Sequence, residues 1–173
     1  MTLLVPEHIV TARLILRPFR EEDWQDLHHY YSCAEATTFT VGRPLSEGET
    51  WRTLCGMIGH WSLRGYGPYA VEEKASGVVV GTVGFWYPND WPGPEIKWAL
   101  APAYWGRGLA SEAARAVHRV GLSHLPDIAL ISFIHAQNTA SIRLARALGA
   151  SLKREVEFRG ANWHIYEHAK VPQ

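Results

Sequence analysis

The stretch YWGRGLASEA, residues 104–113, places two glycines in an aromatic turn directly before alanine-rich sequence that favours a helix. The first turn of a helix leaves about four backbone N–H groups without partners, and the helix dipole adds partial positive charge there. Gly106 and Gly108 carry no side chain that would keep an anion from those groups. The stretch therefore predicts a phosphate-binding turn, and the alternative is a glycine turn with no ligand.

Two nucleotide-binding schemes do not fit this turn. GRG could begin the GxGxxG pattern of a dinucleotide-binding fold, but Ser111 occupies the third glycine position. Asp127, about the right distance downstream for a ribose-binding acid, starts a predicted strand instead of ending one. A P-loop is excluded because the chain has no GK[ST] sequence.

The charge of the chain is balanced, with 17 basic and 17 acidic residues among 173. No overall field would draw it to nucleic acid or to an anionic membrane. The N-terminal sequence has no signal-peptide pattern, and the longest apolar-rich run, GVVVGTVGFWY, is far shorter than the ~20 residues of a membrane span. We therefore expect a cytoplasmic protein that binds neither nucleic acid nor membranes, with Cys33 and Cys55 as free thiols.

Hydrophobic periodicity and turn residues predict alternating strands and helices. Strands are expected at residues 13–19, 69–73, 77–87, 95–100, 128–135, 152–158 and 162–169, and helices at 20–34, 46–63, 108–123 and 139–148. The second helix begins with Ser46 and Glu49, which have the spacing of a capping box. With no repeat or linker, this order describes one α/β domain with a mixed sheet over residues 1–173.

Two segments resemble the GNAT superfamily of acetyl-CoA-dependent N-acyltransferases, and more narrowly its RimJ/RimL-type branch: EIKWALAPAYWGRGLASEAARA and NTASIRLARALGA. The superfamily pattern Q/R-x-x-G-x-G/A falls on residues 105–110, with Trp105 in place of the usual glutamine or arginine. A second signature, N-x-x-S with a glycine that ends the helix, falls on Asn138, Ser141 and Gly149. Ala145 stands where many members carry a tyrosine that acts as an acid.

The resemblance implies a GNAT-like α/β fold with a mixed, mostly antiparallel sheet, splayed between its fourth and fifth strands and flanked by about four helices. The pantetheine arm of acetyl-CoA would lie in this split, beside the backbone of Trp98, Ala99 and Leu100. Asn138 and Ser141 would complete the coenzyme site. The pyrophosphate would rest on the turn formed by Gly106, Arg107, Gly108, Leu109, Ala110 and Ser111.

Acetyl transfer to an amine needs a base for the amine and an acid for the departing thiolate. By resemblance Ser141 is the proton donor, although a serine in the first turn of a helix also commonly bonds the backbone. Glu157 matches an acid that precedes an aromatic residue in this branch, and Glu95, at the start of the fourth strand, is a second candidate base acting through water. Each carboxylate also fits an ion-paired surface position. His135, at the end of a strand, is a candidate for proton relay.

The segment FWYPNDWPGPE places Trp86, Tyr87 and Trp91 in a turn rich in proline and glycine, where aromatic residues suit substrate contact. Core packing explains Trp86 equally well. His164 and His168 would lie ~13 Å apart along a strand, too far for one metal ion, so no metal is expected.

Together these features predict an acetyl-CoA-dependent N-acetyltransferase acting as a monomer or homodimer. Its acceptor is expected to be the amine of a small molecule or of a protein N-terminus. A catalytically idle acyl-CoA-binding or regulatory module is the alternative, and Ala145 in place of the tyrosine is the feature that favours it.

Overall fold

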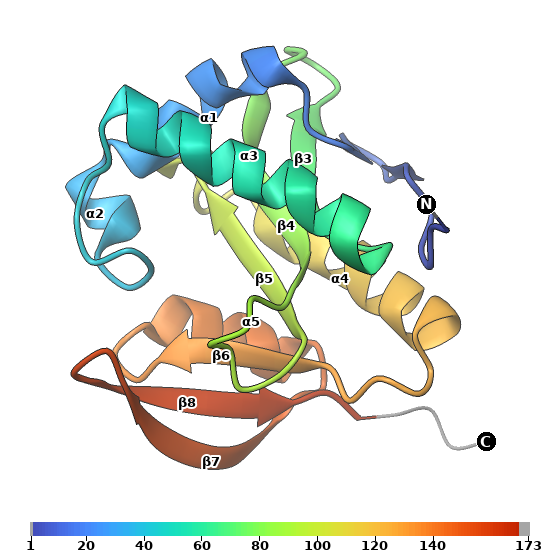
Figure 1. Ribbon diagram of the computed structural model, residues 1–173, viewed down its shortest axis with the longest axis vertical. Coiled ribbons are helices and arrows are strands. Elements are labelled where there is room, and N and C mark those ends of the chain that lie inside the picture. Colours follow the sequence, from blue (N-terminus) through green and yellow to red (C-terminus); the bar gives the residue numbers. More distant parts are fainter. Residues whose placement is uncertain (1, 170–173) are drawn as a thin grey trace.

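A computed structural model describes residues 2–169 (Figure 1). Its sheet contains β1 (Ile9–Val10), β2 (Leu14–Arg17), β3 (Pro68–Glu73), β4 (Val79–Trp86), β5 (Glu95–Leu100), β6 (Ile131–His135), β7 (Ser151–Phe158) and β8 (Ala161–Glu167). The α-helices are α1 (Trp24–Tyr31), α2 (Ala34–Thr37), α3 (Glu47–Arg64), α4 (Leu109–His124) and α5 (Thr139–Ala147). Short 3-10 turns lie at Glu21–Asp23 and Pro102–Tyr104.

The sheet is antiparallel except at one junction. Its strand order is β1-β2-β3-β4-β5-β6-β8-β7, and within the described residues only β5 and β6 pair in parallel. β5 pairs with β4 along its whole length, from Glu95 opposite Trp86 to Leu100 opposite Gly81, whereas β5 and β6 meet only where Glu95 lies opposite Ile131. The two strands therefore diverge toward their C-terminal ends, which confirms the predicted split between them (Figure 1).

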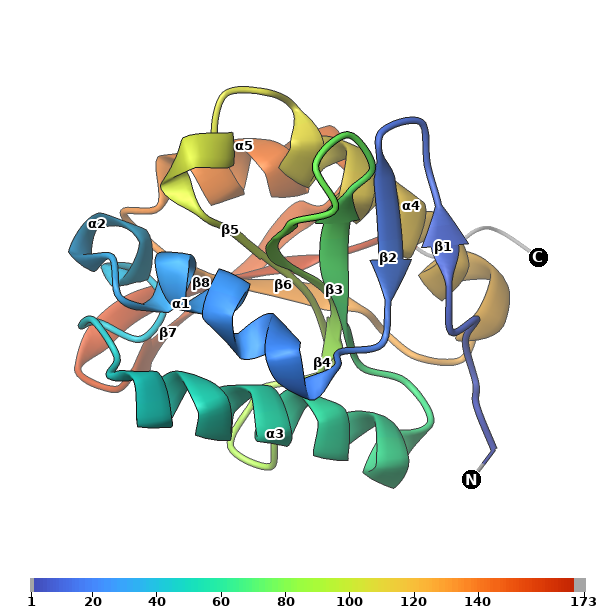
Figure 2. The ribbon, with the colours of Figure 1, turned by 90° about the horizontal axis from the view of Figure 1, so that it is seen from above.

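Helices cover both faces of the sheet (Figure 2). On one face α1 and α3 pack over β3 and β4, burying Leu54 and Met57. On the other face α4 packs over β4 and β5, where Ala113 and Val117 are buried with Phe85. No helix among residues 2–169 combines the length and apolarity needed to cross a bilayer. Each face of the sheet thus packs against its own cluster of apolar residues. The split between β5 and β6 lies between the helices of the two faces.

Most predicted elements are confirmed within a few residues. Ser46 caps α3, because its Oγ accepts from Glu49 N at 3.3 Å and the Glu49 carboxylate accepts from Ser46 N at 2.9 Å. Cys33 and Cys55 are free thiols and are half-buried. The turn between β7 and β8 consists of Arg159 and Gly160, and both residues have positive φ.

Other predicted boundaries differ for local reasons. The helix expected at residues 20–34 begins as a 3-10 turn, because the Asp23 carboxylate bonds the Arg17 guanidinium at 2.8 Å and Arg20 N at 2.7 Å, and it breaks before α2. The strand expected from residue 128 starts at Ile131, because Ile128 N bonds Leu125 O in a turn. β1 has two residues, too few to produce an alternating pattern, so the sheet has one strand more than predicted.

Buried His168 and half-buried His118 lie beside each other, close to Ser132 of β6. The Ser132 hydroxyl donates to Ile96 O at 3.2 Å, and His168 Nε2 lies 2.9 Å from the same hydroxyl. Because the hydroxyl proton is already used, His168 Nε2 carries a proton and donates it to Ser132 Oγ. The His118 ring lies 4.9 Å from the His168 ring, centroid to centroid. Burial, with a smaller contribution from His118, lowers the pKa of His168 to about 4.

This depressed pKa predicts that His168 contributes less to the stability of the fold in acid. The unfolded chain binds a proton at His168 near pH 6.5, whereas the folded protein does so only near pH 4. The stability contributed by neutral His168 is therefore present above pH 6.5 and is lost as the pH falls toward 4, by about 2 kcal/mol between pH 7 and pH 5. Other groups that titrate in this window contribute equally to the parent and to His168→Gln, which keeps a donor toward Ser132. Urea unfolding should therefore show the loss as a difference: from pH 7 to pH 5 the parent should lose about 2 kcal/mol relative to His168→Gln. Equal pH dependence in the two proteins would contradict the assignment.

Candidate active site

The aromatic turn holds both of its glycines in the left-handed region. Gly106 has φ +71° and Gly108 has φ +74°, and α4 begins at the next residue, Leu109. Residues with side chains rarely adopt these φ values, and a Cβ built on Gly106 meets no atom within 4 Å. The first amides of α4 thus lie beside an open, glycine-lined surface.

A clamp formed by Arg13 and Glu112 holds this turn against β2. Glu112 accepts from Arg13 Nε at 2.7 Å, from Arg13 N at 2.8 Å and from Thr11 Oγ1 at 2.6 Å. A guanidinium N–H of Arg13 also donates to Arg107 O at 2.8 Å. The Arg107 side chain extends to Glu73, 2.5 Å away. Sequence reasoning missed this clamp, because its two residues lie 99 positions apart and each resembles an ordinary surface charge.

A cleft of about 720 Å³ lies beside the turn and reaches into the split between β5 and β6. It brings together residues from β5, the turn, α4 and α5. The predicted coenzyme residues that line it are Trp98, Ala99, Leu100, Gly106, Gly108, Leu109, Ala110, Ser111, Asn138 and Ser141. Arg107 is the one predicted coenzyme residue that does not line this cleft.

Ser141 lies in the first turn of α5 with its hydroxyl toward β5. Asn138 caps the helix, since its Oδ1 accepts from Ser141 N at 3.1 Å. The indole Nε1 of Trp98 donates to Ser141 Oγ at 3.1 Å. An indole N–H can only donate, so Ser141 Oγ is the acceptor in this bond and its own proton stays available for a second partner.

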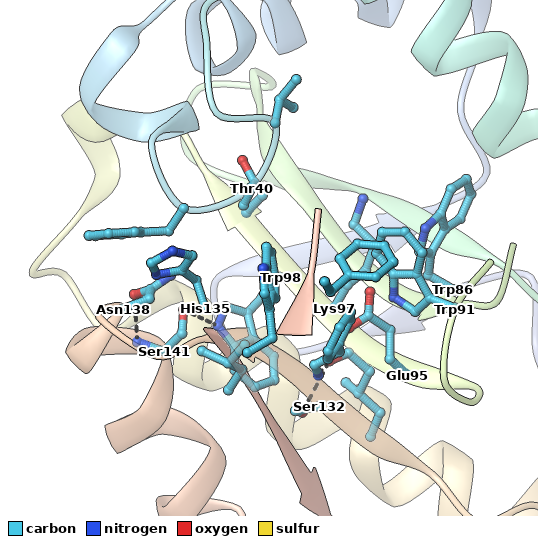
Figure 3. A pocket seen from close by; sticks show the side chains of 18 of the residues that line it. Thr40, Trp86, Trp91, Glu95, Lys97, Trp98, Ser132, His135, Asn138 and Ser141 are labelled. Carbon is cyan, nitrogen blue, oxygen red and sulfur yellow. Dashed lines mark hydrogen bonds between the residues drawn. The ribbon is translucent and has the colours of Figure 1, made fainter. Parts of the chain in front are cut away.

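A second cavity of about 210 Å³, which we call the aromatic cavity, adjoins the cleft and shares Trp98, Ala99, Asn138 and Ser141 with it. Its aromatic lining consists of Tyr30, Tyr31, Phe39, Trp86, Trp91, Trp98, Phe133, His135, Phe158 and Trp163. Figure 3 shows Asn138 and Ser141 at the left of this cavity, and Trp86, Trp91, Glu95 and Lys97 at its right. The two cavities together cross the split in the sheet.

Glu95 lies at the apex of the split and is 5% exposed. One carboxylate oxygen accepts from Phe133 N at 3.2 Å. Burial raises the pKa of Glu95 to about 7, and the nearby Lys97 ammonium partly offsets that rise. Burial likewise lowers the pKa of Lys97. The aromatic cavity therefore contains a carboxyl group that gains and loses its proton near neutral pH.

Of the other predicted site residues, some line the aromatic cavity and others lie outside it. Trp86 and Trp91 line the aromatic cavity, whereas Tyr87 lies outside it with the Arg64 guanidinium 4.5 Å from its ring centroid. Glu157 is exposed on β7 and lines neither cavity. His135 lines the aromatic cavity, 5.1 Å from the Phe39 ring between centroids.

Sequence reasoning missed several lining residues of the aromatic cavity, among them Lys97, Phe133, Phe158 and Trp163. One signal was present, because Lys97 follows Glu95 by two positions in a strand and must share its face. The aromatic residues gave no such signal, since they resemble ordinary core positions.

Metal-ligating side chains are not grouped in the described part of the chain, where no three histidine, cysteine or acidic residues could hold one ion. His164 lies 3.6 Å from Glu155, while His168 contacts Ser132. Ala145 is fully buried in α5, beside Ile134.

Comparison with known proteins defines the class to which this split sheet and its paired cavities belong. Residues 13–151 match the family described as Acetyltransferase (GNAT) domain. The chain is 31% identical over 166 residues to "Uncharacterized N-acetyltransferase p20" of Bacillus licheniformis, covering 95% of this chain and 89% of that protein. The chain belongs to the GNAT acetyltransferase family, as its motifs predicted.

Solved structures agree with this fold. An acetyltransferase from Agrobacterium tumefaciens str. C58 superposes with a TM-score of 0.84 at 26% identity, covering 96% of this chain and 95% of that one. The ribosomal L7/L12 alpha-N-protein acetyltransferase RimL, solved in complex with coenzyme A, has a TM-score of 0.75 at 21% identity, covering 94% and 97%. At that identity the likeness to RimL concerns the fold alone.

The environment of Glu95 predicts a carboxyl group that titrates near pH 7. Removing the neighbouring cation in Lys97→Met should raise this pKa further, because the ionised carboxylate loses its opposite charge. Carbon-detected NMR titration of glutamate carboxyl groups would measure both values. A midpoint near the ordinary value of 4.5 in the parent would show that burial does not govern this group.

Proposed function

We propose that this protein is an N-acetyltransferase that uses acetyl-CoA and acetylates a primary amine, with both substrates bound at once. The observation that carries the proposal is the meeting of the two cavities at Trp98 and Ser141, between the open amides of α4 and the buried Glu95. The fold shared with a coenzyme A complex of RimL supports the same reading. When bound, acetyl-CoA supplies the acetyl group as an activated thioester.

The cleft fits the diphosphate of a coenzyme at its α4 end. Gly106 and Gly108 leave the first amides of α4 open, and the partial positive charge of the helix start favours an anion there. We assign this contact to the backbone of residues 106–111. Arg107 contributes its backbone only, because its side chain is paired with Glu73.

The exposed edge of β5 suits the pantetheine arm. Beyond Glu95 no strand in the described part of the chain pairs with this edge. The carbonyls of Ile96 and Leu100 on it are taken by the side chains of Ser132, at 3.2 Å, and Trp105, at 2.7 Å. Because alternate residues of a strand point their backbone groups to the same side, Trp98 between them presents its N–H and C=O to the cleft. An amide of the arm would satisfy these groups.

Glu95 is our choice for the general base. A base must be partly ionised at the working pH and still accept a proton readily, and a pKa of about 7 meets both needs. Glu157 is the second choice, because it is exposed and lies outside the cavity lining. Ser141 is the proposed acid, since its hydroxyl accepts from Trp98 and keeps its proton free to donate into the cleft.

The acceptor would enter the aromatic cavity with its amine toward Glu95. A small molecule and a protein N-terminus both offer such an amine. An idle acyl-CoA-binding module remains the alternative, because Ala145 supplies no hydroxyl. The availability of the Ser141 proton argues for turnover.

Release of free thiol from acetyl-CoA across an amine panel tests this function. The parent should turn over at least one amine, and Ser141→Ala should lower kcat by ~10²-fold while coenzyme affinity changes little, because an acid acts mainly in the transition state. Coenzyme binding without turnover on any amine would favour the idle module. Equal turnover by parent and Ser141→Ala would remove Ser141 from the reaction.

The glycine turn makes a separate prediction about binding. Gly108→Val forces a branched residue to φ +74° and places its Cβ 3.5 Å from Arg13 Nη2, so the turn should shift and affinity for coenzyme A should fall by at least about 10²-fold. Arg115→Ala is the matched control on the same helix, since Arg115 is exposed and bonds only Ser111 Oγ, at 3.3 Å, among the described residues. Calorimetry with coenzyme A and dephospho-coenzyme A should show equal weakening for Gly108→Val. Parent-like affinity in that variant would show that the turn does not hold the diphosphate.

A further inference from the structure

We propose that the acceptor is a free amino acid with an aromatic or large aliphatic side chain, whose carboxylate is bound by Lys97 while its amine meets Glu95. This inference rests on the proposed function and names the substrate class of the same site. The contact with Lys97 would distinguish a free amino acid from a protein N-terminus, because the N-terminal residue of a protein has an uncharged amide where the amino acid has its carboxylate.

Lys97 makes no direct ion pair within the described residues, although the Glu95 carboxylate and the Trp86 ring lie near it. It lies half-buried in the aromatic cavity, with Nζ 5.2 Å from the centroid of the Trp86 ring. Among residues 2–169, Nζ makes no hydrogen bond and no ion pair within 4.0 Å. Lys97 and Glu95 share one face of β5, roughly 7 Å apart along the strand at ~3.3 Å per residue. Both side chains line the aromatic cavity, so one small ligand bound there can approach both charges.

The second cationic group of the cavity is already neutralised. Arg159 pairs with Asp90 at 2.8 Å and lies over the rings of Trp91 and Phe158, at 5.5 and 4.8 Å from their centroids. Lys97 is therefore the cation that a bound anion can reach without breaking an existing pair. Removing its water on binding would be unfavourable unless the ligand supplied a negative group.

An unpartnered N–H donor in the cavity lining points to the same ligand chemistry. Trp91 Nε1 and Trp163 Nε1 are buried and make no hydrogen bond of normal length within the described residues. Trp91 Nε1 is close enough to Glu95 to lower the pKa of its carboxyl group, so Trp163 Nε1 is the donor without a neighbouring acceptor. A buried donor without a partner destabilises the protein, and such groups call for an explanation. A carboxylate has two acceptor oxygens, so a ligand that carries one offers partners to such donors as well as to Lys97.

The charges of the site match those of an amino acid. Glu95 faces the cavity as the acidic group and Lys97 as the basic group, while an amino acid carries an amine and a carboxylate on adjacent atoms. A simple amine would satisfy Glu95 and leave Lys97 desolvated and unpaired. A peptide N-terminus would offer Lys97 a carbonyl but no charge. The amino acid satisfies both groups.

The walls of the cavity select the side chain. Trp91, Phe133 and Phe158 pack edge to face with centroids 5.1–5.8 Å apart, and Trp163 closes the same cluster. These rings present an apolar surface that suits an aromatic or branched aliphatic group. The volume of about 210 Å³ equals that of roughly seven water molecules at ~30 Å³ each, which suits a single small molecule.

The test compares acceptors that differ only at the carboxylate. Rates are measured at saturating acetyl-CoA with L-phenylalanine and L-leucine, with their amides, and with the amines that lack the carboxyl group. The parent should prefer at least one amino acid over its amide by about 10- to 100-fold in kcat/KM, the range expected for a hydrogen-bonded charge. The amide has the less basic α-amine, and this difference alone would favour the amide. A preference for the amino acid must therefore come from its carboxylate.

Three variants assign the preference to Lys97. Lys97→Met should bring the ratio of kcat/KM for acid over amide close to one, and Lys97→Arg should keep most of the parent ratio. Lys97→Met also changes the proton affinity of Glu95, but that change affects both acceptors and cancels in the ratio. Lys153→Met removes an exposed lysine on β7 and should keep the parent ratio as the matched control.

Each outcome decides the question. Turnover of the amides at least as fast as of the amino acids overturns the amino-acid acceptor, leaves N-acetyl transfer intact and favours a peptide N-terminus. If no acceptor turns over, calorimetry with L-phenylalanine and L-leucine in the presence of coenzyme A decides: binding of either that Lys97→Met weakens supports the proposal, and absence of binding overturns it. A protein that fails to bind coenzyme A overturns the proposed function, and this proposal with it.

Discussion

β5 and β6 share a single pair of residues, Glu95 opposite Ile131, and the rest of the site depends on that limit. Parallel strands that start together and then diverge leave backbone groups of β5 without a partner strand. Such groups need other partners. Side chains of Ser132 and Trp105 take two of the carbonyls, and the remainder of the edge faces a cleft. Because β6 diverges from β5, the backbone edge of β5 forms a binding surface instead of pairing with a neighbouring strand.

The same split explains the behaviour of Glu95. At the one position where β5 pairs with β6, its carboxylate is covered by β6 and by the aromatic rings around it, so burial raises its pKa to about 7. Lys97, two residues further along β5, also lines the cavity and makes no direct ion pair in the described chain. Glu95 and Lys97 lie on the same face of β5, but β6 pairs with β5 only at Glu95. The two charged groups therefore have different environments.

On the other side of the split, the start of α4 is fixed by a contact distant in sequence. The Arg13–Glu112 clamp joins β2 to the first turns of the helix and also holds the carbonyl of Arg107. Two left-handed glycines need such support, because glycine loses more conformational freedom on ordering than other residues do. The fold thereby keeps the amides of α4 in place before any ligand arrives.

The sequence by itself determined the elements and the family. Period-two and helical patterns located most strands and helices, the Ser46–Glu49 capping box located the start of α3, and the WGRGLA and NTAS motifs pointed to the GNAT fold. These features are local, since each depends on residues a few positions apart. Only the tertiary structure decided which side chains share a cavity: Lys97 with Trp91 and Trp163, the clamp of Arg13 on Glu112, and Glu157 outside the site. Burial and unpaired polar groups are properties of packed neighbours far apart in the chain, so no local pattern encodes them.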